Sequence, residues 1–166
     1  MNNITTKRGD TGATSLADGT RVDKDNLRIE LNGELDELMA CLGLCKAACR
    51  QAEPYATLQQ QLMGLMALVA NPSPRLSAAD EKTVTEAVAQ MEREIDQCCQ
   101  SAGPFGFVLP GTDLADAALH MARAKARTCE RRMVALAKTE PVAPPMLTYL
   151  NRLSDYLFAL AMGRME

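Results

Sequence analysis

The sequence predicts a single all-α domain, a bundle of five helices. After the first 22 residues, apolar side chains recur at the spacing of amphipathic helices, and no convincing strand pattern interrupts them. Hydrophobic residues make up 47% of the chain, whereas aromatic residues make up only 4% and Trp is absent. The core must therefore consist of Leu, Ala, Met, Val and Ile, as in helical bundles. The chain of 166 residues has the size of one domain, residues 1–166.

The five helices are separated by residues that end or begin helices. We predict them at 24–51, 55–70, 78–100, 112–138 and 144–164. Asp25 is the expected cap of the first helix, and Pro54 closes that helix and opens the second. The sequence NPSPR then ends the second helix, and Ser77 with Asp80 resembles a capping box with a shortened acid.

Each of the first three helices has an apolar stripe that is expected to face the core. The stripes are Leu27, Leu31, Leu35, Leu38, Leu42 and Cys45; then Leu58, Leu62, Leu65, Met66 and Val69; then Val84, Val88, Met91 and Ile95. The fourth helix begins at a cap on Thr112 or Asp113. The fifth begins at Pro144 and Pro145, because proline suits the first turn of a helix.

The linker at 101–111, SAGPFGFVLPG, contains three of the ten glycines and two of the eight prolines, yet it is unusually apolar. Phe107, Val108 and Leu109 have two interpretations. They pack under a neighbouring helix, or they contact a ligand, and the pattern alone favours neither.

The N-terminal loop, residues 1–22, contains the polar sequence TTKRGDTGATS. Gly9 and Gly12 allow positive φ and a close approach of the backbone to a ligand. Successive N–H groups in such a turn form an anion site, the hydroxyl groups of Thr and Ser add donors, and Lys7 adds a positive charge. The loop therefore predicts a polyphosphate site, and a disordered N-terminal arm is the alternative.

The fourth helix carries five cations within ten residues: Arg123, Lys125, Arg127, Arg131 and Arg132. At about 100° per residue, Asp116, Arg123, Arg127 and Glu130 fall within about 60° on one face. That face is either solvated, near the C-terminus of the helix dipole, or it is the counterpart of the cationic loop.

Polar groups also interrupt the apolar runs of the first and fifth helices. Asn151, Asp155 and Phe158 lie at i, i+4 and i+7, and Asp36 and Glu37 lie within the sequence LDELMA. Burying such groups without partners costs about 1–3 kcal/mol each. We therefore expect partners, either ligand hydroxyls or arginines within the chain or across a subunit interface.

Composition excludes several classes of protein. A net charge of −3 disfavours a nucleic-acid-binding module. The N-terminus lacks an apolar signal segment and no run of 18 apolar residues occurs, so we expect a cytoplasmic protein without membrane insertion. The six cysteines are expected to be thiols, and Cys41, Cys45 and Cys49 form a stripe that favours packing over metal binding.

Several catalytic mechanisms lack their motifs. The helices carry no Glu-x-x-His pairs, and neither a Walker A sequence nor a Rossmann fingerprint is present. One histidine gives little basis for a Ser-His-Asp hydrolase. The residues alone indicate a helical bundle that binds a nucleoside polyphosphate.

Three ordered segments of the chain resemble a known family. They are TKRGDTGATSL with RVDKDNLRIELNGELDEL, then FVLPG, and finally ARAKARTCERR with YLNRLSDYLF. Together they are similar to the PduO-type ATP:corrinoid (cob(I)alamin) adenosyltransferases over nearly the whole chain. The resemblance implies a homotrimer of five-helix bundles, with an ATP and corrinoid site at each subunit interface.

The resemblance also implies roles for individual residues. The loop that wraps the triphosphate, with Mg²⁺ bridging its oxygens, corresponds to Thr6, Lys7, Gly9, Asp10, Gly12, Thr14 and Ser15, followed by Lys24 and Arg28 as further phosphate contacts. Arg127 matches the ATP-binding arginine, Glu130 its neighbouring acid, and Asn151 a nucleotide-binding asparagine. Asp36 and Arg123 match a pair that forms an intersubunit salt bridge beside the corrinoid.

Phe107 aligns with the family phenylalanine that occupies the lower face of the corrin, so the resemblance favours the ligand interpretation of the linker. Three positions depart from the family: Thr128 replaces a frequent arginine, Asn32 a frequent aromatic residue, and Met39 a frequent asparagine. These departures concern the affinity for the corrinoid and its upper pocket.

The implied reaction transfers the 5′-deoxyadenosyl group of ATP to a cob(I)alamin-type corrinoid and releases inorganic triphosphate. Cobalt(I) is a strong nucleophile, so the protein needs to orient C5′ and neutralise the leaving group. A cob(II)alamin reductase and an adenosylcobalamin-dependent enzyme are expected partners. The alternative function is a non-catalytic carrier or regulatory protein that binds ATP or adenosylcobalamin.

Overall fold

The structure is a computed structural model that describes residue 7 and residues 9–72, 76–101 and 108–163. In chain order its elements are β1 (Ala13–Ser15), β2 (Arg21–Asp23), α1 (Leu27–Cys49), α2 (Tyr55–Ala70), α3 (Ala78–Ser101), α4 (Leu114–Ala137) and α5 (Pro144–Met162). The predicted all-α, five-helix architecture is confirmed, with one short hairpin added to it.

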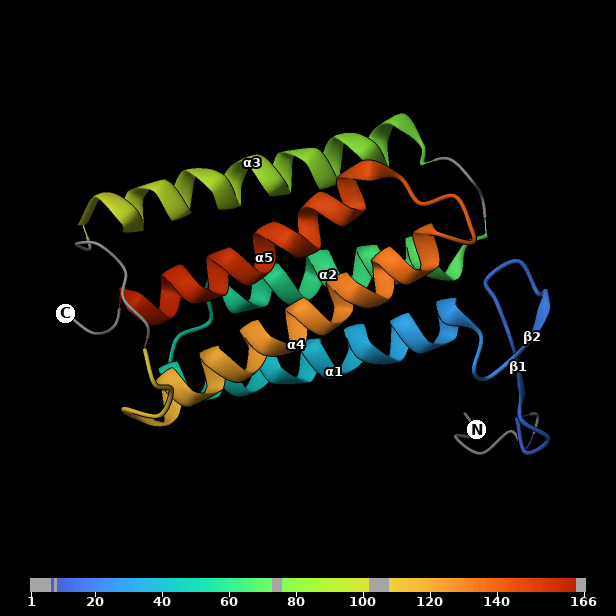
Figure 1. Cartoon of the computed structure of the whole chain (residues 1–166), viewed down its shortest axis with the longest axis horizontal. Helices are drawn as coiled ribbons and strands as arrows, with labels where there is room; N and C mark the ends of the chain where they lie inside the picture. Colours follow the sequence, from blue (N-terminus) through green and yellow to red (C-terminus); the bar gives the residue numbers. More distant parts are fainter. Residues whose placement is uncertain (1–6, 8, 73–75, 102–107, 164–166) are drawn as a thin grey trace.

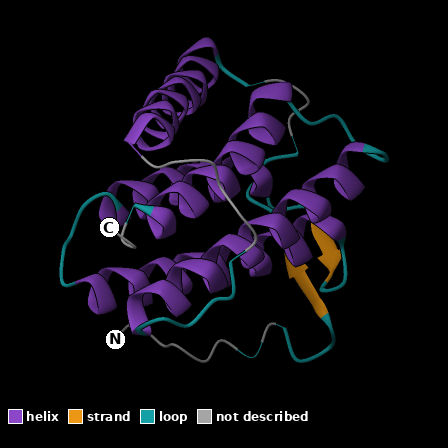
Figure 2. Ribbon diagram, turned by 60° about the vertical axis from the view of Figure 1, so that its left-hand side comes forward, coloured by secondary structure: helices purple, strands orange, loops and turns teal. Residues whose placement is uncertain are grey.

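The helices lie side by side along the long axis of the molecule (Figure 1). α4 packs against both α1 and α5, α2 packs against α1, and α3 packs against α5. The two strands lie outside the bundle, at one end of it (Figure 2). α4 is therefore the central element, and α3 is the outermost helix.

The predicted apolar stripes form the core. Leu31, Leu35, Leu38 and Leu42 of α1 are fully buried, as is Leu62 of α2. The stripe residues at the edge of the core are only partly buried: Leu27, Met66, Val84 and Ile95. Burying each large apolar side chain contributes about 1.5–3 kcal/mol, so these stripes supply most of the driving force for helix packing.

Of the three side-chain caps that the sequence predicted, two are confirmed. The Asp113 carboxylate accepts from the N–H of Asp116 at 2.7 Å. Ser77 Oγ donates to Asp80 at 2.6 Å and accepts from the N–H of Asp80 at 3.1 Å. The prediction for α1 was wrong: Asn26 caps this helix in place of Asp25, with its side-chain oxygen accepting from the N–H of Arg28 at 2.9 Å.

The expectation of a chain without strands was also wrong. β1 and β2 pair antiparallel with Thr14 opposite Val22. The turn between them is closed by Asp18, which accepts from the N–H and the hydroxyl of Thr20, and by Gly19 at φ +88°. Each strand has only three residues and few apolar side chains, so the sequence shows no alternation of polar and apolar residues that would predict a strand.

The hairpin is attached to the bundle by one buried side chain and one backbone hydrogen bond. Leu16 is buried, and the N–H of Ala17 donates to the carbonyl of Ala70 at 3.0 Å. Ala70 is the last residue of α2. The position of the hairpin therefore depends on the end of α2.

Arg28 holds that end of α2 in place. The side chain is almost fully buried, its Nε donates to Glu140 at 2.6 Å, and its Nη1 donates to the carbonyls of Val69 and Asn71 at 2.9 and 3.1 Å. One guanidinium thus joins the start of α1, the end of α2 and the segment before α5. We call this group of contacts the Arg28 clamp.

The cysteines are all free thiols. Burial raises the pKa of Cys45 to about 12 and that of Cys129 to about 12, so both remain protonated and pack as small apolar groups. In the described ranges, no three His, Cys, Asp or Glu side chains converge as metal ligands. None of the helices in these ranges combines the length and the apolar character that crossing a membrane requires.

Replacing Arg28 by methionine is expected to lower the free energy of unfolding by about 3 kcal/mol, because Glu140 and two carbonyl groups lose a buried donor. Urea unfolding at fixed protein concentration, followed by circular dichroism, measures this loss. Arg132→Met is the control, since Arg132 pairs with Glu30 at the surface at 2.8 Å and its loss should cost less than about 1 kcal/mol. Equal small losses in both variants would contradict the clamp.

Candidate functional site

The hairpin brings Lys24 against the glycine turn of the N-terminal loop. The N–H of Gly12 donates to the carbonyl of Gly9 at 3.2 Å, and the N–H of Lys24 donates to the carbonyl of Gly12 at 2.9 Å. A Cβ atom on Gly9 would lie only 3.1 Å from Lys24 Nζ, and Gly12 has a φ of +82°. Glycine at both positions therefore permits the turn and the close approach of the ammonium group.

Most of the predicted phosphate-binding residues on this loop are accessible. Those exposed are Lys7, Asp10, Gly12, Ser15 and Lys24, whereas Gly9 and Thr14 are half-buried. Lys7 has a φ of +58°, an uncommon conformation for a residue other than glycine. The turn therefore offers accessible ammonium groups beside a glycine-rich backbone, which suits an anion. Thr6 lies outside the described residues.

Arg28, the last predicted phosphate contact near this loop, has a different environment. Only 3% of the residue is exposed, and Nε and Nη1 donate to the partners of the Arg28 clamp. Nη2 is buried and has no hydrogen-bond partner within the described residues. The structure thus gives Arg28 a structural role that the sequence did not predict, and its contact with phosphate stays a prediction.

The middle of α4 presents Arg127 to solvent. This arginine is exposed, and it makes no hydrogen bond or ion pair with any part of the chain that the structure describes. Nearby Lys125 differs, since its Nζ contacts both Glu34 and Glu37 of α1. Among the residues that the structure describes, Arg127 therefore has no counterion, and it is exposed to an anionic ligand.

Asp116 does not belong to the ionic face that the helical spacing predicted. The residue is buried, and its carboxylate accepts from the N–H groups of Gly111 and Thr112 at 2.6 and 3.1 Å. The hydrogen bond from Gly111, helped by those from Thr112, holds the pKa of Asp116 below its usual range despite burial. Asp116 is therefore buried and does not contribute to an exposed ionic face of α4.

Asn151 is held in a fixed orientation between α4 and α5. Its Nδ2 donates to Glu130 at 2.9 Å, and its Oδ1 accepts from Arg152 Nη1 at 2.9 Å. Arg152 is fixed in turn by Glu92 of α3 at 2.7 Å. The sequence interpretation named Asn151 and Glu130 but missed Arg152 and Glu92. The only sequence signal for Arg152 was its position next to Asn151. No sequence signal pointed to Glu92.

The predicted pair of Asp36 and Arg123 is not formed within one chain. Asp36 is exposed and has no polar partner among the residues described, whereas Arg123 Nε donates to His120 Nδ1 at 3.3 Å. Both observations agree with the expectation that these two residues meet only across a subunit interface. His120 was not predicted as a site residue, although it is the only histidine and precedes Arg123 by one helical turn.

The linker is described only from Val108 onward, so Phe107 lies outside the described residues. Val108 is half-buried, but Leu109 is 77% exposed. Of the two interpretations left open for the linker, packing under a neighbouring helix therefore does not hold for Leu109. An exposed leucine beside a half-buried valine leaves apolar surface available at this end of α4.

The hairpin and the described end of the linker lie at opposite ends of the bundle. The hairpin lies at the end where α1 begins, and the linker leads into the start of α4 at the other end (Figure 1). With 24 residues, α4 is about 36 Å long at about 1.5 Å per residue. A ligand that contacted both the hairpin and the start of α4 within one chain would have to span about that length.

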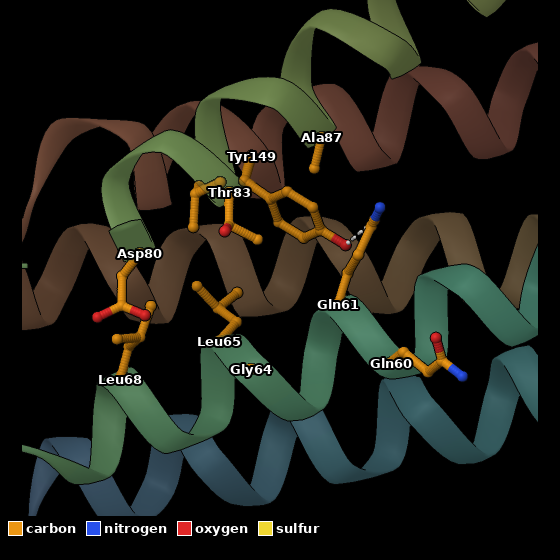
Figure 3. Close-up of a pocket in the computed structure, with 10 residues that line it drawn as sticks. Gln60, Gln61, Gly64, Leu65, Leu68, Asp80, Thr83, Ala87 and Tyr149 are labelled. Atoms are coloured by element: carbon orange, nitrogen blue, oxygen red, sulfur yellow. Dashed lines mark hydrogen bonds between the residues drawn. The ribbon is translucent and has the colours of Figure 1, made fainter. Parts of the chain in front are cut away.

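A separate cavity of about 270 Å³ lies between α2, α3 and α5 (Figure 3). Its walls include Leu65 and Gln61 of α2, Thr83 of α3 and Tyr149 of α5. The hydroxyl of Tyr149 donates to Gln61 at 3.0 Å, and burial raises the pKa of Tyr149. None of the predicted site residues lines this cavity.

Comparison with known proteins identifies the family. The sequence profile of the cobalamin adenosyltransferases matches residues 4–163. The chain is 39% identical over 165 residues to a corrinoid adenosyltransferase of Citrobacter freundii, covering 97% of this chain and 94% of that protein. It is 42% identical over 163 residues to the corrinoid adenosyltransferase PduO of Salmonella typhimurium, covering 95% of this chain and 48% of that protein.

Solved structures agree with these relatives. A variant of the PduO-type ATP:corrinoid adenosyltransferase from Lactobacillus reuteri, complexed with cobalamin and ATP, superimposes with a TM-score of 0.86 at 30% sequence identity. The match covers 98% of this chain and 90% of that chain. The chain spans nearly all of the Citrobacter relative but about half of the Salmonella protein. Profile, relatives and fold together place this chain in the cobalamin adenosyltransferase family.

Proposed function

We propose that this chain transfers the 5′-deoxyadenosyl group of ATP to the cobalt of a reduced corrinoid, forming adenosylcobalamin or a related product and inorganic triphosphate. One observation carries the proposal most directly: Arg127 is an exposed arginine with no counterion among the described residues, one helical turn from the Glu130 that holds Asn151. A polyphosphate supplies the missing charge, and Asn151 is already oriented to contact the nucleoside.

The chemistry of the reaction determines what the corrinoid and the protein must each contribute. The cobalt(I) of the corrinoid substrate attacks C5′ of ATP, the C5′–O bond breaks, and the electron pair leaves with the triphosphate. No proton has to be removed, so no general base is required. The protein positions C5′ and stabilises the leaving group, for which we assign Lys7, Lys24 and Arg127.

Mg²⁺ is part of the proposal as a companion of ATP. Mg²⁺ usually keeps several water ligands and binds one or two carboxylates together with substrate phosphates, so it does not need a cluster of protein ligands. The exposed carboxylate of Asp10 and the hydroxyl groups of Thr14 and Ser15 are suitable additional ligands beside the turn. The cation would neutralise charge on the leaving triphosphate.

We also propose that the site is assembled between subunits of a homotrimer. The hairpin and the start of α4 lie at opposite ends of one bundle, and Asp36 has no partner among the described residues of its own chain. A cyclic arrangement repeats one contact three times and brings different ends of neighbouring chains together. In it, Asp36 of one subunit pairs with Arg123 of the next, beside the corrinoid.

For Phe107 we propose contact with the lower face of the corrin. An apolar ring there excludes water and the lower base and leaves cobalt(II) four-coordinate and easier to reduce. The half-buried Val108 and exposed Leu109 extend this apolar surface. We place the reaction in the cytoplasm, with a cob(II)alamin reductase supplying electrons and an adenosylcobalamin-dependent enzyme using the product.

The activity is tested with purified protein, ATP, Mg²⁺ and chemically reduced cobalamin in the dark. We expect a light-sensitive adenosyl product and one inorganic triphosphate per product. Binding of ATP and cobalamin without product would instead select the non-catalytic carrier. Folded protein that neither binds nor turns over would contradict both functions.

Replacing Arg127 by alanine is expected to lower kcat/KM by about 10- to 100-fold, because each charge-assisted contact is worth about 1.5–3 kcal/mol. The measurement is initial rate with cobalt(I) supplied ready-made. Arg131→Ala is the matched control: this arginine is also exposed on α4, and it donates to Thr128 at 2.9 Å. Its rate should stay within about twofold of the unmodified protein. Equal losses in both variants would argue against a specific contact of Arg127.

A further inference from the structure

A buried polar cluster lies in the first half of α4, between the linker and Arg123. Its members are Asp116, which is 2% exposed, and His120, which is 5% exposed and one turn further along the helix. Burying a carboxylate and an imidazole costs free energy unless both are bonded, and apolar residues of similar size would pack at lower cost. The cluster therefore calls for an explanation beyond packing.

Asp116 fixes the end of the linker. Its Oδ2 accepts from the N–H groups of Gly111 and Thr112, the residues that connect the linker to α4. Gly111 has a φ of +109°, a conformation that residues with a side chain rarely adopt. The carboxylate thus holds a glycine-dependent bend directly after the segment that contains Phe107.

His120 fixes Arg123 on the other side. Its Nδ1 accepts from Arg123 Nε at 3.3 Å, and its ring lies edge-on to Phe158 with centroids 6.2 Å apart. A neutral imidazole that accepts at Nδ1 carries its proton on Nε2. That atom lies 3.4 Å from Asp116 Oδ1. Within the described part of the chain, neither of these two buried atoms has another hydrogen-bond partner, so each is the available partner of the other.

The contact at Nε also sets which edge of Arg123 remains free. A guanidinium has five N–H donors in a planar fork, and Nε–H is the donor nearest the stem. With this donor engaged by His120, the terminal nitrogens of the half-buried Arg123 remain for a carboxylate. Such a carboxylate can bind in the bidentate geometry that arginine favours.

We propose that Asp116 and His120 are positioning residues of the adenosyl-transfer site. Through one chain of contacts they set the orientation of the Arg123 guanidinium and hold Gly111 and Thr112, where the linker meets α4. The inference rests on the proposed function, because it assigns Arg123 and the linker to the corrinoid. It adds that both are aligned by one buried carboxylate–imidazole pair within the same subunit, before any neighbour or ligand binds.

Three variants of His120 separate its contact with Arg123 at Nδ1 from its contact with Asp116 at Nε2. His120→Asn keeps an acceptor near the position of Nδ1, His120→Gln keeps a donor near the position of Nε2, and His120→Ala keeps neither. Steady-state rates with cobalt(I) give KM for the corrinoid and for ATP separately. Tyr149→Phe, which removes a buried hydroxyl from the cavity of Figure 3, is the control for a general loss of packing.

The alanine variant should raise KM for the corrinoid about tenfold while KM for ATP stays within about twofold. The asparagine variant should recover most of this loss, and the glutamine variant less, because only asparagine still accepts from Arg123. In an Arg123→Ala background the difference between asparagine and glutamine should vanish, since residues that act through one another are not additive.

Equal losses for corrinoid and ATP, or indistinguishable asparagine and glutamine variants in a protein that turns over normally, would overturn the inference. If the alanine variant does not fold, the asparagine and glutamine variants still decide it. Absence of product from the unmodified protein would instead overturn the proposed function together with this inference.

Discussion

The packing of α4 between α1 and α5 is the constraint on which the rest of the structure depends. One side of this helix is fully buried, with Leu119, Ala126 and Met133 in the core. Arg127 lies beside this buried side and is exposed, and Arg123 is half-buried. Because the helix is held on both sides, these cations stand on a rigid support. A site that works by positioning and charge needs such a support.

At each end of the bundle, buried polar contacts hold a loop in place. At one end the Arg28 clamp joins three segments and so supports the hairpin through the end of α2. At the other end Asp116 holds the bend that leads into α4. Both contacts place a charged group in the interior, where it is stabilising only if its partners are present. Each thereby specifies one arrangement of a loop that lacks a core of its own.

Helical periodicity predicted much of this fold, because the stripes of α1 and α2 coincide with the buried residues. Local chemistry was harder to predict. Asp25 and Asn26 are both good caps, and the choice between them depends on the turn that the hairpin imposes. The Arg28 clamp could not be predicted because the partners of Arg28 come from residues 69–71 and 140, far away in sequence. The resemblance to a family supplied the roles of Asp36 and Phe107, which no pattern in one chain reveals.

The central claim is that the phosphate loop of one subunit works with the α4 cations of another. Two variants that are each expected to lose most of the activity, Lys7→Ala and Arg127→Ala, test it when they are co-expressed with different tags and the mixed assemblies are isolated. In a cyclic trimer one of the three interfaces then has both residues intact, so we expect about a third of the unmodified activity to return. Mixed assemblies that remain as inactive as either variant alone would show that the site lies within one chain, and would contradict the account.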